Sequence, residues 1–276
     1  MQSDEIISSL KRVSTKLGNS RYSLANRAVL TYNYFVMKLQ KLLSMVRRCD
    51  SDFALIEKND RIAVGLSGGK DSLALLYALA AYRRFCPNPF ELCAIVIDAG
   101  AGADFSPLSP LCEQLGVPLH IVETQIAPIV FEERKEKNPC SLCAKMRRGA
   151  LDGKLNELGY NTLALGHNAD DMAETFLLGM LYEGRLNTLQ PKSYLDRAGI
   201  KLIRPLLYVR EKETAAFVKE NGVPIIFNPC PANGFTQRET MKSLIAEMCK
   251  ITPDAFERMH SALTHPERNN LLPKKE

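Results

Sequence analysis

The order of apolar segments between residues 61 and 181 constrains the fold of this chain more than any other feature. Short aliphatic segments typical of buried strands alternate there with longer segments whose apolar residues recur at helical spacing. The expected strands are 61–66, 92–97, 118–122 and 162–165, and the expected helices are 72–84, 107–115, 144–158 and 169–181. This alternation predicts an α/β fold in which helices cover both faces of a parallel sheet.

The flanking segments are mainly helical in pattern. We expect helices over residues 4–17 and about 23–48, and near 210–221, 236–249 and 253–263, with a short strand near 202–203 and an apolar segment at 223–227. A chain of 276 residues fits one large domain with a smaller appendage. The expected parts are a basic helical arm (1–50), the α/β domain (51–190), a C-terminal part (191–265) and a tail (266–276).

Composition indicates a globular protein without a membrane anchor. Hydrophobic residues make up 46% and charged residues 24% of the chain. No apolar run reaches the roughly 18 residues that a membrane helix needs. The N-terminus shows neither the basic region nor the apolar region of a signal peptide. We therefore expect a cytoplasmic protein.

Positive charge is concentrated at the N-terminus. Residues 1–50 contain nine Lys or Arg against three acidic residues, a net charge of +6, whereas the whole chain carries +5. A basic arm on a nearly neutral body is typical of a protein that binds a polyanion such as RNA. A solvated helix face would give the same pattern.

A glycine-rich turn follows the first expected strand: Gly65-Leu66-Ser67-Gly68-Gly69-Lys70-Asp71-Ser72. Backbone amides in such a turn, together with the N-terminus of the next helix, attract phosphate. The spacing excludes a Walker A loop, because three residues rather than four separate Gly65 from Gly69 and an aspartate follows the lysine. The Rossmann glycine spacing is also absent. An ordinary strand-to-helix turn has no need for a lysine and two serines here.

Two further motifs end strands of the same expected sheet. Asp98 follows the second strand, and Gly166-His167-Asn168-Ala169-Asp170-Asp171-Met172-Ala173-Glu174 follows the fourth. The second motif could be a simple helix start, with Asn168 as the N-cap and His167 as a structural histidine. Parallel α/β sheets bind ligands at the carboxyl ends of their strands, so the three motifs together predict a ligand site.

The first of these motifs resembles a known family. Ser-Gly-Gly-x-Asp-Ser after a buried strand is similar to the signature of PP-loop enzymes, the adenine-nucleotide alpha hydrolases. The resemblance implies cleavage of ATP between its α and β phosphates, adenylation of a substrate and release of pyrophosphate. A Gly-His-x-x-Asp-Asp turn also recurs in the PP-loop enzymes that modify tRNA, where the positions of Gly166 and Asp171 lie near the nucleotide.

The cysteines narrow the resemblance. Eight cysteines in a chain expected in the cytoplasm argue against a disulfide framework, and Cys86, Cys93 and Cys112 lie in apolar surroundings that indicate core residues. Pro139-Cys140-Ser141-Leu142-Cys143-Ala144-Lys145-Met146-Arg147-Arg148-Gly149 resembles the central segment of tRNA 2-thiocytidine synthetases. Arg204-Pro205-Leu206, Asn228-Pro229-Cys230 and Gln237-Arg238 resemble their C-terminal half, so the similarity covers about residues 25–265.

That resemblance implies a 4Fe–4S cluster held by Cys140, Cys143 and Cys230, with one iron left open for sulfide. The related 2-thiouridine synthetases share the three cysteines but carry two zinc fingers, for which this chain has no Cys-x-x-Cys near either terminus. One departure from the family is Asn233, where a second Cys-x-x-Cys commonly ends. A structural zinc site would need four ligands, and a helix-start pair without metal is the other alternative.

The resemblance also implies the roles of individual residues. ATP is expected at Leu66, Ser67, Gly68, Gly69, Lys70, Ser72, Ile97, Asp98, Gly166 and Asp171, with Lys70, Asp71 and Asp171 in catalysis and Mg²⁺ on the phosphates. Lys145, Arg147, Arg148 and the N-terminal arm are candidates for contact with tRNA.

The expected partners are tRNA, a sulfur donor (a cysteine desulfurase or free sulfide) and a second copy of the chain. Two other functions fit the motifs. One is a PP-loop enzyme that adenylates a small molecule or another sulfur acceptor, and the other is a nucleotide or iron–sulfur sensor without catalysis.

Overall fold

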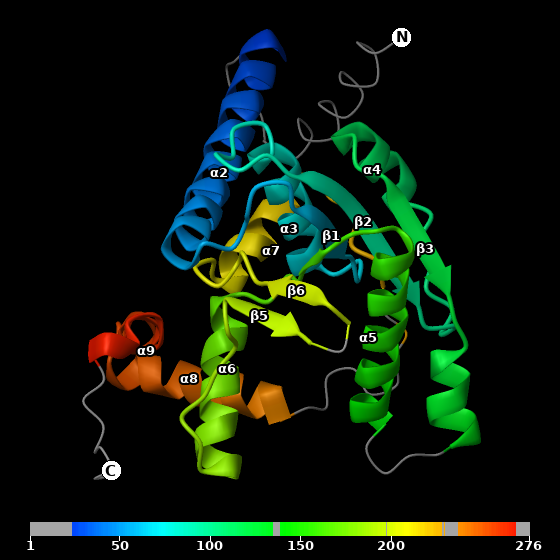
Figure 1. Ribbon diagram of the computed structural model, residues 1–276. Helices are drawn as coiled ribbons and strands as arrows, with labels where there is room; N and C mark the ends of the chain where they lie inside the picture. Colours follow the sequence, from blue (N-terminus) through cyan, green and yellow to red (C-terminus); the bar gives the residue numbers. More distant parts are fainter. Residues whose placement is uncertain (1–23, 135–138, 197, 228, 230–236, 269–276) are drawn as a thin grey trace.

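The computed structural model describes residues 24–134, 139–196, 198–227, 229 and 237–268, with side chains from residue 39 onward. Its centre is a six-stranded sheet in the order β3-β2-β1-β4-β6-β5 (Figure 1). The strands are β1 (Arg61–Gly65), β2 (Glu91–Asp98), β3 (Leu119–Glu123), β4 (Thr162–Ala164), β5 (Lys192–Leu195) and β6 (Ile200–Ile203). Every neighbouring pair is parallel except β5 and β6.

The order of the strands reverses beside β1. From β1 the chain adds β2 and β3 on one side, and then returns to place β4 on the other side. In register, Val64 of β1 pairs with Ala94 of β2 and Ala164 of β4. The loops that leave the carboxyl ends of β1 and β4 therefore start next to each other. A crevice between loops at such a reversal point is where open α/β sheets bind ligands.

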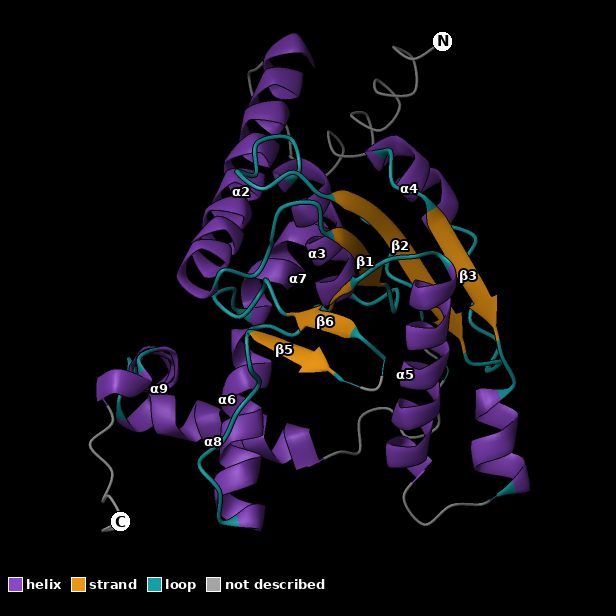
Figure 2. Cartoon of the chain, viewed as in Figure 1, coloured by secondary structure: helices purple, strands orange, loops and turns teal. Residues whose placement is uncertain are grey.

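Helices cover both faces of the sheet, as Figure 2 shows. They are α2 (Leu24–Phe53), α3 (Lys70–Tyr82), α4 (Leu108–Leu115), α5 (Pro139–Glu157), α6 (Ala169–Leu178), α7 (Glu211–Glu220), α8 (Gln237–Ile251) and α9 (Ala255–Thr264). Short π-helical turns follow at Pro128–Glu133 and Gly179–Glu183, and a 3₁₀ turn at Pro266–Arg268.

Alternation along the central strand explains the two apolar layers. Ile62 and Val64 of β1 pack with α2, α3, α4 and α7 on one face, whereas Ala63 packs with α5 on the other. All three side chains are fully buried, as expected for a strand covered on both faces. A third, smaller cluster joins α6, α8 and α9. The predicted α/β fold with a parallel sheet and helices on both faces is confirmed, and β5 is an antiparallel addition at the edge.

The β5–β6 hairpin was only partly predictable. The sequence predicts a short strand near residues 202–203, where β6 lies, but not its partner. β5 reads Lys-Ser-Tyr-Leu and has Tyr194 62% exposed, because an edge strand has a neighbour on one side only. Its apolar pattern is therefore too weak to distinguish it from a loop.

One helix boundary that differs from the prediction is the start of α5. The pattern predicts a helix from residue 144, but α5 begins at Pro139, a residue that is favourable in the first turn of a helix. Cys140 and Cys143 consequently lie inside the first turn rather than in a loop before the helix. Cys86, Cys93 and Cys112 are buried, as predicted for core residues, and none of the cysteines in the described ranges forms a disulfide.

The basic N-terminal segment is described only in part. Within α2, the side chains of Leu42, Val46 and Cys49 are buried in the main core, so the second half of this helix is part of the domain's packing. The helix predicted over residues 4–17 lies outside the described residues. In the part of the chain that the structure describes, no helix is long and apolar enough to cross a lipid bilayer.

Candidate nucleotide site and the cysteine-bearing helix

The loop after β1 is held in shape by its own two serines. The backbone amide of Ser67 donates to the Ser72 hydroxyl at 3.2 Å, and that hydroxyl lies 2.9 Å from the carbonyl oxygen of Gly69, to which it donates. The Gly69 amide in turn donates to the Ser67 hydroxyl at 3.3 Å. These bonds close the turn immediately before α3, whose N-terminus carries the positive end of the helix dipole. The result is a compact turn, residues 65–72, which we call the phosphate-binding turn because the sequence predicts phosphate binding there.

Gly68 is required by its surroundings in this loop. Its φ of +78° lies in the left-handed region, and a Cβ there would lie 2.5 Å from the Cβ of Ile226. Ile226 also donates its backbone amide to the Gly68 carbonyl oxygen at 2.9 Å. Ile226, from the segment at 223–227, therefore packs directly on the phosphate-binding turn and precedes Cys230 by four positions in the sequence.

The turn after β4 packs tightly against the same loop. A Cβ on Gly166 would lie 2.9 Å from the backbone nitrogen of Ser72, so no side chain fits at this position. Asn168 caps α6: its side-chain oxygen accepts from the amides of Asp170 and Asp171, and the Asp171 carboxylate accepts from the Asn168 amide. The two motifs that the sequence places at separate strand ends are thus in contact.

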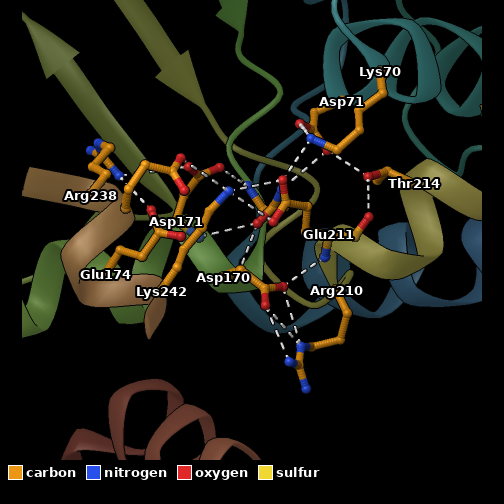
Figure 3. Close-up of polar contacts among 12 residues, drawn as sticks. Lys70, Asp71, Asp170, Asp171, Glu174, Arg210, Glu211, Thr214, Arg238 and Lys242 are labelled. Atoms are coloured by element: carbon orange, nitrogen blue, oxygen red, sulfur yellow. Dashed lines mark hydrogen bonds and ion pairs between the residues drawn. The ribbon is translucent and has the colours of Figure 1, made fainter. Parts of the chain in front are cut away.

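Lys70 lies in a network of charges at the start of α3. Its ammonium is 2.9 Å from the Asp71 carboxylate and 2.7 Å from that of Glu211, the first residue of α7 (Figure 3). Burial lowers the pKa of Lys70, but its hydrogen bonds with the two carboxylates outweigh burial and raise the pKa overall. Thr214 donates to the other oxygen of Asp71. Lys70 is therefore charged, and its charge is balanced by carboxylates.

A second group of charges surrounds Asp171 on α6. Arg238 of α8 lies 3.6 Å from Asp171 and 3.3 Å from Glu174, whose side chain is 2% exposed. Burial and the charge of Asp171 raise the pKa of Glu174 to about 7, and burial likewise raises the pKa of Asp171. Lys242, one turn after Arg238, pairs with Glu211 at 3.1 Å. Figure 3 shows that α8 thereby reaches both charge groups.

A cavity of about 420 Å³ opens between these strand ends and α5. Its walls are Gly65, Leu66, Ser67, Gly69, Asp71, Ser72, Ile95, Ile97, Ala144, Arg147, Arg148, Leu151, Leu165, Gly166 and His167. Leu66, Ser67, Gly69, Ser72, Ile97 and Gly166 were predicted to bind ATP. Gly68, Lys70, Asp98 and Asp171 are not among the lining residues. Asp98 instead accepts a hydrogen bond from the Gly100 amide at 2.8 Å.

Helix α5 carries the cysteine pair and one wall of the cavity. Cys140 is exposed and Cys143 is half-buried in the first turn. Arg147 lies one helical turn after Cys143 and lines the cavity, while Lys145 is exposed and does not. Cys230 and Asn233 lie outside the described residues. Within the described ranges, no three His, Cys, Asp or Glu side chains are grouped closely enough to hold a metal ion.

Several side chains of this site were not predicted from the sequence. Glu211 and Thr214 reach Lys70 and Asp71 from α7, more than 140 residues further along the chain. Arg204, which donates to the ring of His167 at 3.3 Å, belongs to a motif that was matched to the family without a role. The Glu213 carboxylate accepts from the Arg210 amide at 3.1 Å at the start of α7, but this local bond does not reveal a long-range contact.

Comparisons with known proteins agree with this geometry. A model of the PP-loop domain family matches residues 33–245. A protein of Pelobacter propionicus named tRNA-cytidine(32) 2-sulfurtransferase is 38% identical over 237 residues, which cover 84% of this chain and 88% of the relative. A protein of the same name from Geobacter sulfurreducens is 37% identical over 240 residues, covering 86% and 93%.

One solved structure supports the fold. The U34-tRNA thiolase NcsA from Methanococcus maripaludis, determined with its 4Fe–4S cluster, superposes with a TM-score of 0.66 at 24% identity, over 84% of this chain and 81% of that one. The phosphate-binding turn, the strand order and the extent of the sequence match lead to the same assignment. The chain is a member of the PP-loop family, in the branch that contains the tRNA-cytidine(32) 2-sulfurtransferases.

Proposed function

We propose that the protein is an ATP-dependent tRNA sulfurtransferase that replaces the oxygen at carbon 2 of a cytidine with sulfur. The names of its relatives support the reaction and place their cytidine at position 32. The observation that carries the proposal is that one cavity is lined both by the phosphate-binding turn and by α5, one turn beyond a pair of cysteines. A site with this arrangement brings a nucleotide and a sulfur-handling group to the same substrate.

The nucleotide part of the site follows from the cavity walls. The amides of the turn after β1 and the N-terminus of α3 supply positive potential for the phosphates. Ile95, Ile97 and Leu165 provide an apolar surface on which an adenine ring fits. Gly65 and Gly166 let the strand ends pack closely around the cavity, since a Cβ at these positions would lie 2.9 Å from Leu165 and from Ser72, respectively. These walls suit an adenine nucleotide, which supports ATP as the proposed ligand.

Activation of the base forms one bond and breaks one bond. The oxygen at carbon 2 of the pyrimidine attacks the α-phosphorus of ATP, and the bond to the β-phosphate breaks to release pyrophosphate. Lys70 and the amides of the turn stabilise the charge that develops on pyrophosphate. Mg²⁺, which binds mainly through phosphates and one or two carboxylates, would use Asp71 or Asp171, the two aspartates beside the turn. Replacement of AMP by sulfide then completes the exchange.

The cysteines fit a 4Fe–4S cluster by their chemistry and position. Thiolates are the ligands that iron–sulfur clusters use, and Cys140 and Cys143 lie one helical turn apart on α5. Cys230, the third expected ligand, follows the segment at 223–227 that packs on the phosphate-binding turn. A bound cluster would supply the sulfide that displaces AMP from the activated base.

Recognition of the RNA is proposed to use positive charge around the cavity. Arg147 and Arg148 line its α5 side, and Lys145 is exposed nearby. A base must leave its stack to enter a cavity of this kind, which favours a tRNA loop over a duplex. The sequence-based expectations of a cysteine desulfurase or free sulfide as sulfur source, of a homodimer and of a cytoplasmic location belong to the same proposal.

Nucleoside mass spectrometry of tRNA from a deletion strain tests the function. We expect 2-thiocytidine to disappear, and to return when the wild-type gene is supplied but not when Lys70→Ala is supplied. Lys250→Ala is the matched control, because Lys250 is exposed and its ion pair within the described part of the chain is with Glu247, one turn away on the same helix. Loss of a different thiolated nucleoside would change the base, and unchanged 2-thiocytidine would refute the proposal. A rate of ATP turnover that is the same with and without tRNA would favour a small-molecule substrate.

A further inference from the structure

Arg204 is a partly buried cation without a carboxylate partner among the described residues. Its Nε donates to Nδ1 of His167 at 3.3 Å and its Nη1 donates to the carbonyl oxygen of Gln190, and both acceptors are neutral. Burial and the nearby charge of Arg148 lower the pKa of Arg204 to about 10. Arg204 nevertheless remains protonated at neutral pH. Its positive charge is therefore not balanced by the part of the protein that the structure describes.

His167 connects this cation to the cavity. Because Nδ1 accepts from Arg204, the ring proton of neutral His167 is on Nε2, which makes that nitrogen a donor. Burial and the charges of Arg204, Arg238 and Arg148 lower the pKa of His167 to about 4, so the ring is neutral. His167 lines the cavity next to Gly166. It thus presents a hydrogen-bond donor without adding a charge.

Arg148 brings a second guanidinium to the same part of the cavity. Its Nε donates to Asp152 at 3.1 Å on the neighbouring turn of α5, and the side chain lines the cavity. Its Nη2 is buried and has no acceptor in the described structure. A buried donor without an acceptor costs free energy, and two like charges close together cost more. An anion bound at this position would remove both costs.

We infer that Arg148, His167 and Arg204 form an anion subsite for a phosphate ester, on the α5 side of the cavity and separate from the turn that holds pyrophosphate. The distribution of charge supports this assignment. Lys70, beside the turn, is already balanced by Asp71 and Glu211, and Arg148 is paired with Asp152, whereas Arg204 has no carboxylate partner among the described residues. Arginine is suited to phosphate because its planar group donates two parallel hydrogen bonds.

The inference rests on the proposed function for the source of the phosphate ester. The substrates offer two candidates with the same chemistry, the α-phosphate of ATP and a phosphodiester of the RNA beside the target base. In either case the subsite would hold the phosphate while the oxygen at carbon 2 attacks. Arg148 and Arg204 would contact it, and His167 would add a neutral donor.

Binding measurements on cluster-free protein test the subsite without the thiolation reaction. The variants are Arg204→Met, Arg148→Met and, for rescue of the charge, Arg204→Lys. Arg83→Met is the matched control, because Arg83 also donates to backbone carbonyls, those of Leu115 and Gly116, but does not line the cavity. The probes are a non-hydrolysable ATP analogue, measured by calorimetry, and unmodified tRNA, measured by fluorescence anisotropy over a range of salt concentrations.

We expect Arg204→Met and Arg148→Met each to lower the affinity for one of the two probes by about tenfold, which is typical of losing a hydrogen bond to a charged group. Arg204→Lys should recover part of that affinity. A lower affinity for the ATP analogue would show that the subsite holds a phosphate of ATP. A lower affinity for tRNA, with the slope of log affinity against log salt concentration reduced by about one, would show that the subsite holds a phosphate of the RNA. If Arg204→Met does not fold, the affinities of Arg148→Met alone test the subsite.

The subsite would be overturned if Arg204→Met and Arg148→Met bound both probes as tightly as the wild type and the Arg83→Met control do. The proposed function fails differently, because its failure appears in the wild-type protein as tRNA that is neither bound nor thiolated. If wild-type protein binds the ATP analogue but no tRNA, the analogue measurement alone still decides whether the subsite exists.

Discussion

The side-chain amide of Asn168 donates to the Asp71 carboxylate at 3.1 Å and so joins the first turn of α6 to the first turn of α3. The two residues are 97 positions apart in sequence but follow adjacent parallel strands, β4 and β1. Thr214 donates to the same carboxylate oxygen from α7. Asp71 is therefore the point at which three helices are fixed around the phosphate-binding turn. This arrangement explains why an aspartate follows the lysine of the loop.

Replacing Asn168 with alanine should loosen this junction. The variant loses the N-cap of α6 and the bond to Asp71, so the free energy of unfolding should fall by about 1–2 kcal/mol and affinity for ATP should fall with it. Chemical denaturation and calorimetry measure the two effects. Asn156→Ala is the control, since Asn156 is exposed and its side-chain amide donates to the Ala198 carbonyl oxygen at 3.3 Å, outside the junction. Equal behaviour of the two variants would show that the junction is dispensable.

The sequence predicts the main features of this junction but not its details. Strand-like and helix-like patterns place residues 66–72 and 166–171 at the ends of parallel strands, and the structure brings both segments to one cavity. The pattern does not show that Thr214 reaches Asp71 or that Glu211 reaches Lys70, because such contacts depend on how α7 packs in three dimensions. Local periodicity contains no information about partners more than a hundred residues away.

The early start of α5 illustrates a second limit. Residues 139–143 contain a proline and two cysteines, which give no helical periodicity on their own. The helix forms there because packing of its later turns, through the buried Leu151 and Leu155, extends it toward the N-terminus. Prediction from the sequence therefore placed the cysteine pair before the helix instead of within it.

Removing the Lys70 ammonium should prevent the first chemical step. Lys70→Ala leaves Asp71 and Glu211 without their shared cation, and we expect weaker binding of ATP and no detectable AMP. Asp71→Ala should have the same effect and should also lower stability, because it removes the bonds from Asn168 and Thr214. Radiolabelled ATP with tRNA reports AMP directly. Near-normal AMP formation in both variants would remove this loop from the active site.

The N-terminal segment should determine how RNA binding responds to salt. Deleting residues 1–21 removes four of the nine basic groups in residues 1–50, and each lost phosphate contact flattens the dependence of affinity on salt. The deletion spares the buried part of α2 at Leu42 and Val46, so the fold should persist. Anisotropy titrations with tRNA at several salt concentrations give the slope. A slope identical to that of the full chain would mean that this segment does not contact RNA.

The free energy of unfolding should depend on pH through Glu174 and His167, whose contributions change in opposite directions. The pKa of Glu174 is about 7 when folded and 4.5 ordinarily, so the stability linked to its proton is present below about pH 4.5 and lost as the pH rises through 7. The pKa of His167 is about 4 against 6.5, so its contribution is present above about pH 6.5 and lost as the pH falls through 4. Between these limits the two effects partly cancel.

Single substitutions should separate the two responses. Glu174 is faced by Asp171, Arg238 and Lys242, and Glu174→Gln keeps its shape while removing its titration. Relative to the wild type, this variant should lose less stability as the pH rises from 4.5 to 7. His167→Gln should lose less stability than the wild type as the pH falls from 6.5 to 4. Thermal unfolding midpoints across this range check both, and parallel curves for all three proteins would show that neither group titrates as described.

The three cysteines should be required for sulfur transfer but not for binding of ATP. Cys140 and Cys143 share the first turn of α5, but Cys230 is 87 residues beyond Cys143, so the proposed cluster would give all three a joint reason to be cysteine. Protein purified without oxygen should be brown and contain about four irons and four sulfides per chain. Cys230→Ser should lose the colour and the thiolation while keeping its affinity for ATP, since Ser67, Gly69 and Ser72 form the bonds that hold the phosphate-binding turn.

Two matched variants make the test of the cluster specific. Cys249→Ser changes a half-buried cysteine of α8 and should keep both iron and activity. Asn233→Ala should also keep the cluster, because three thiolates leave the fourth iron without a protein ligand. One zinc per chain in place of iron would remove the sulfur-transfer mechanism and leave the nucleotide site intact, since structural zinc is held by four ligands and provides no open iron for sulfide. A Cys230→Ser protein that stays brown and fully active would show that Cys230 has no part in the site.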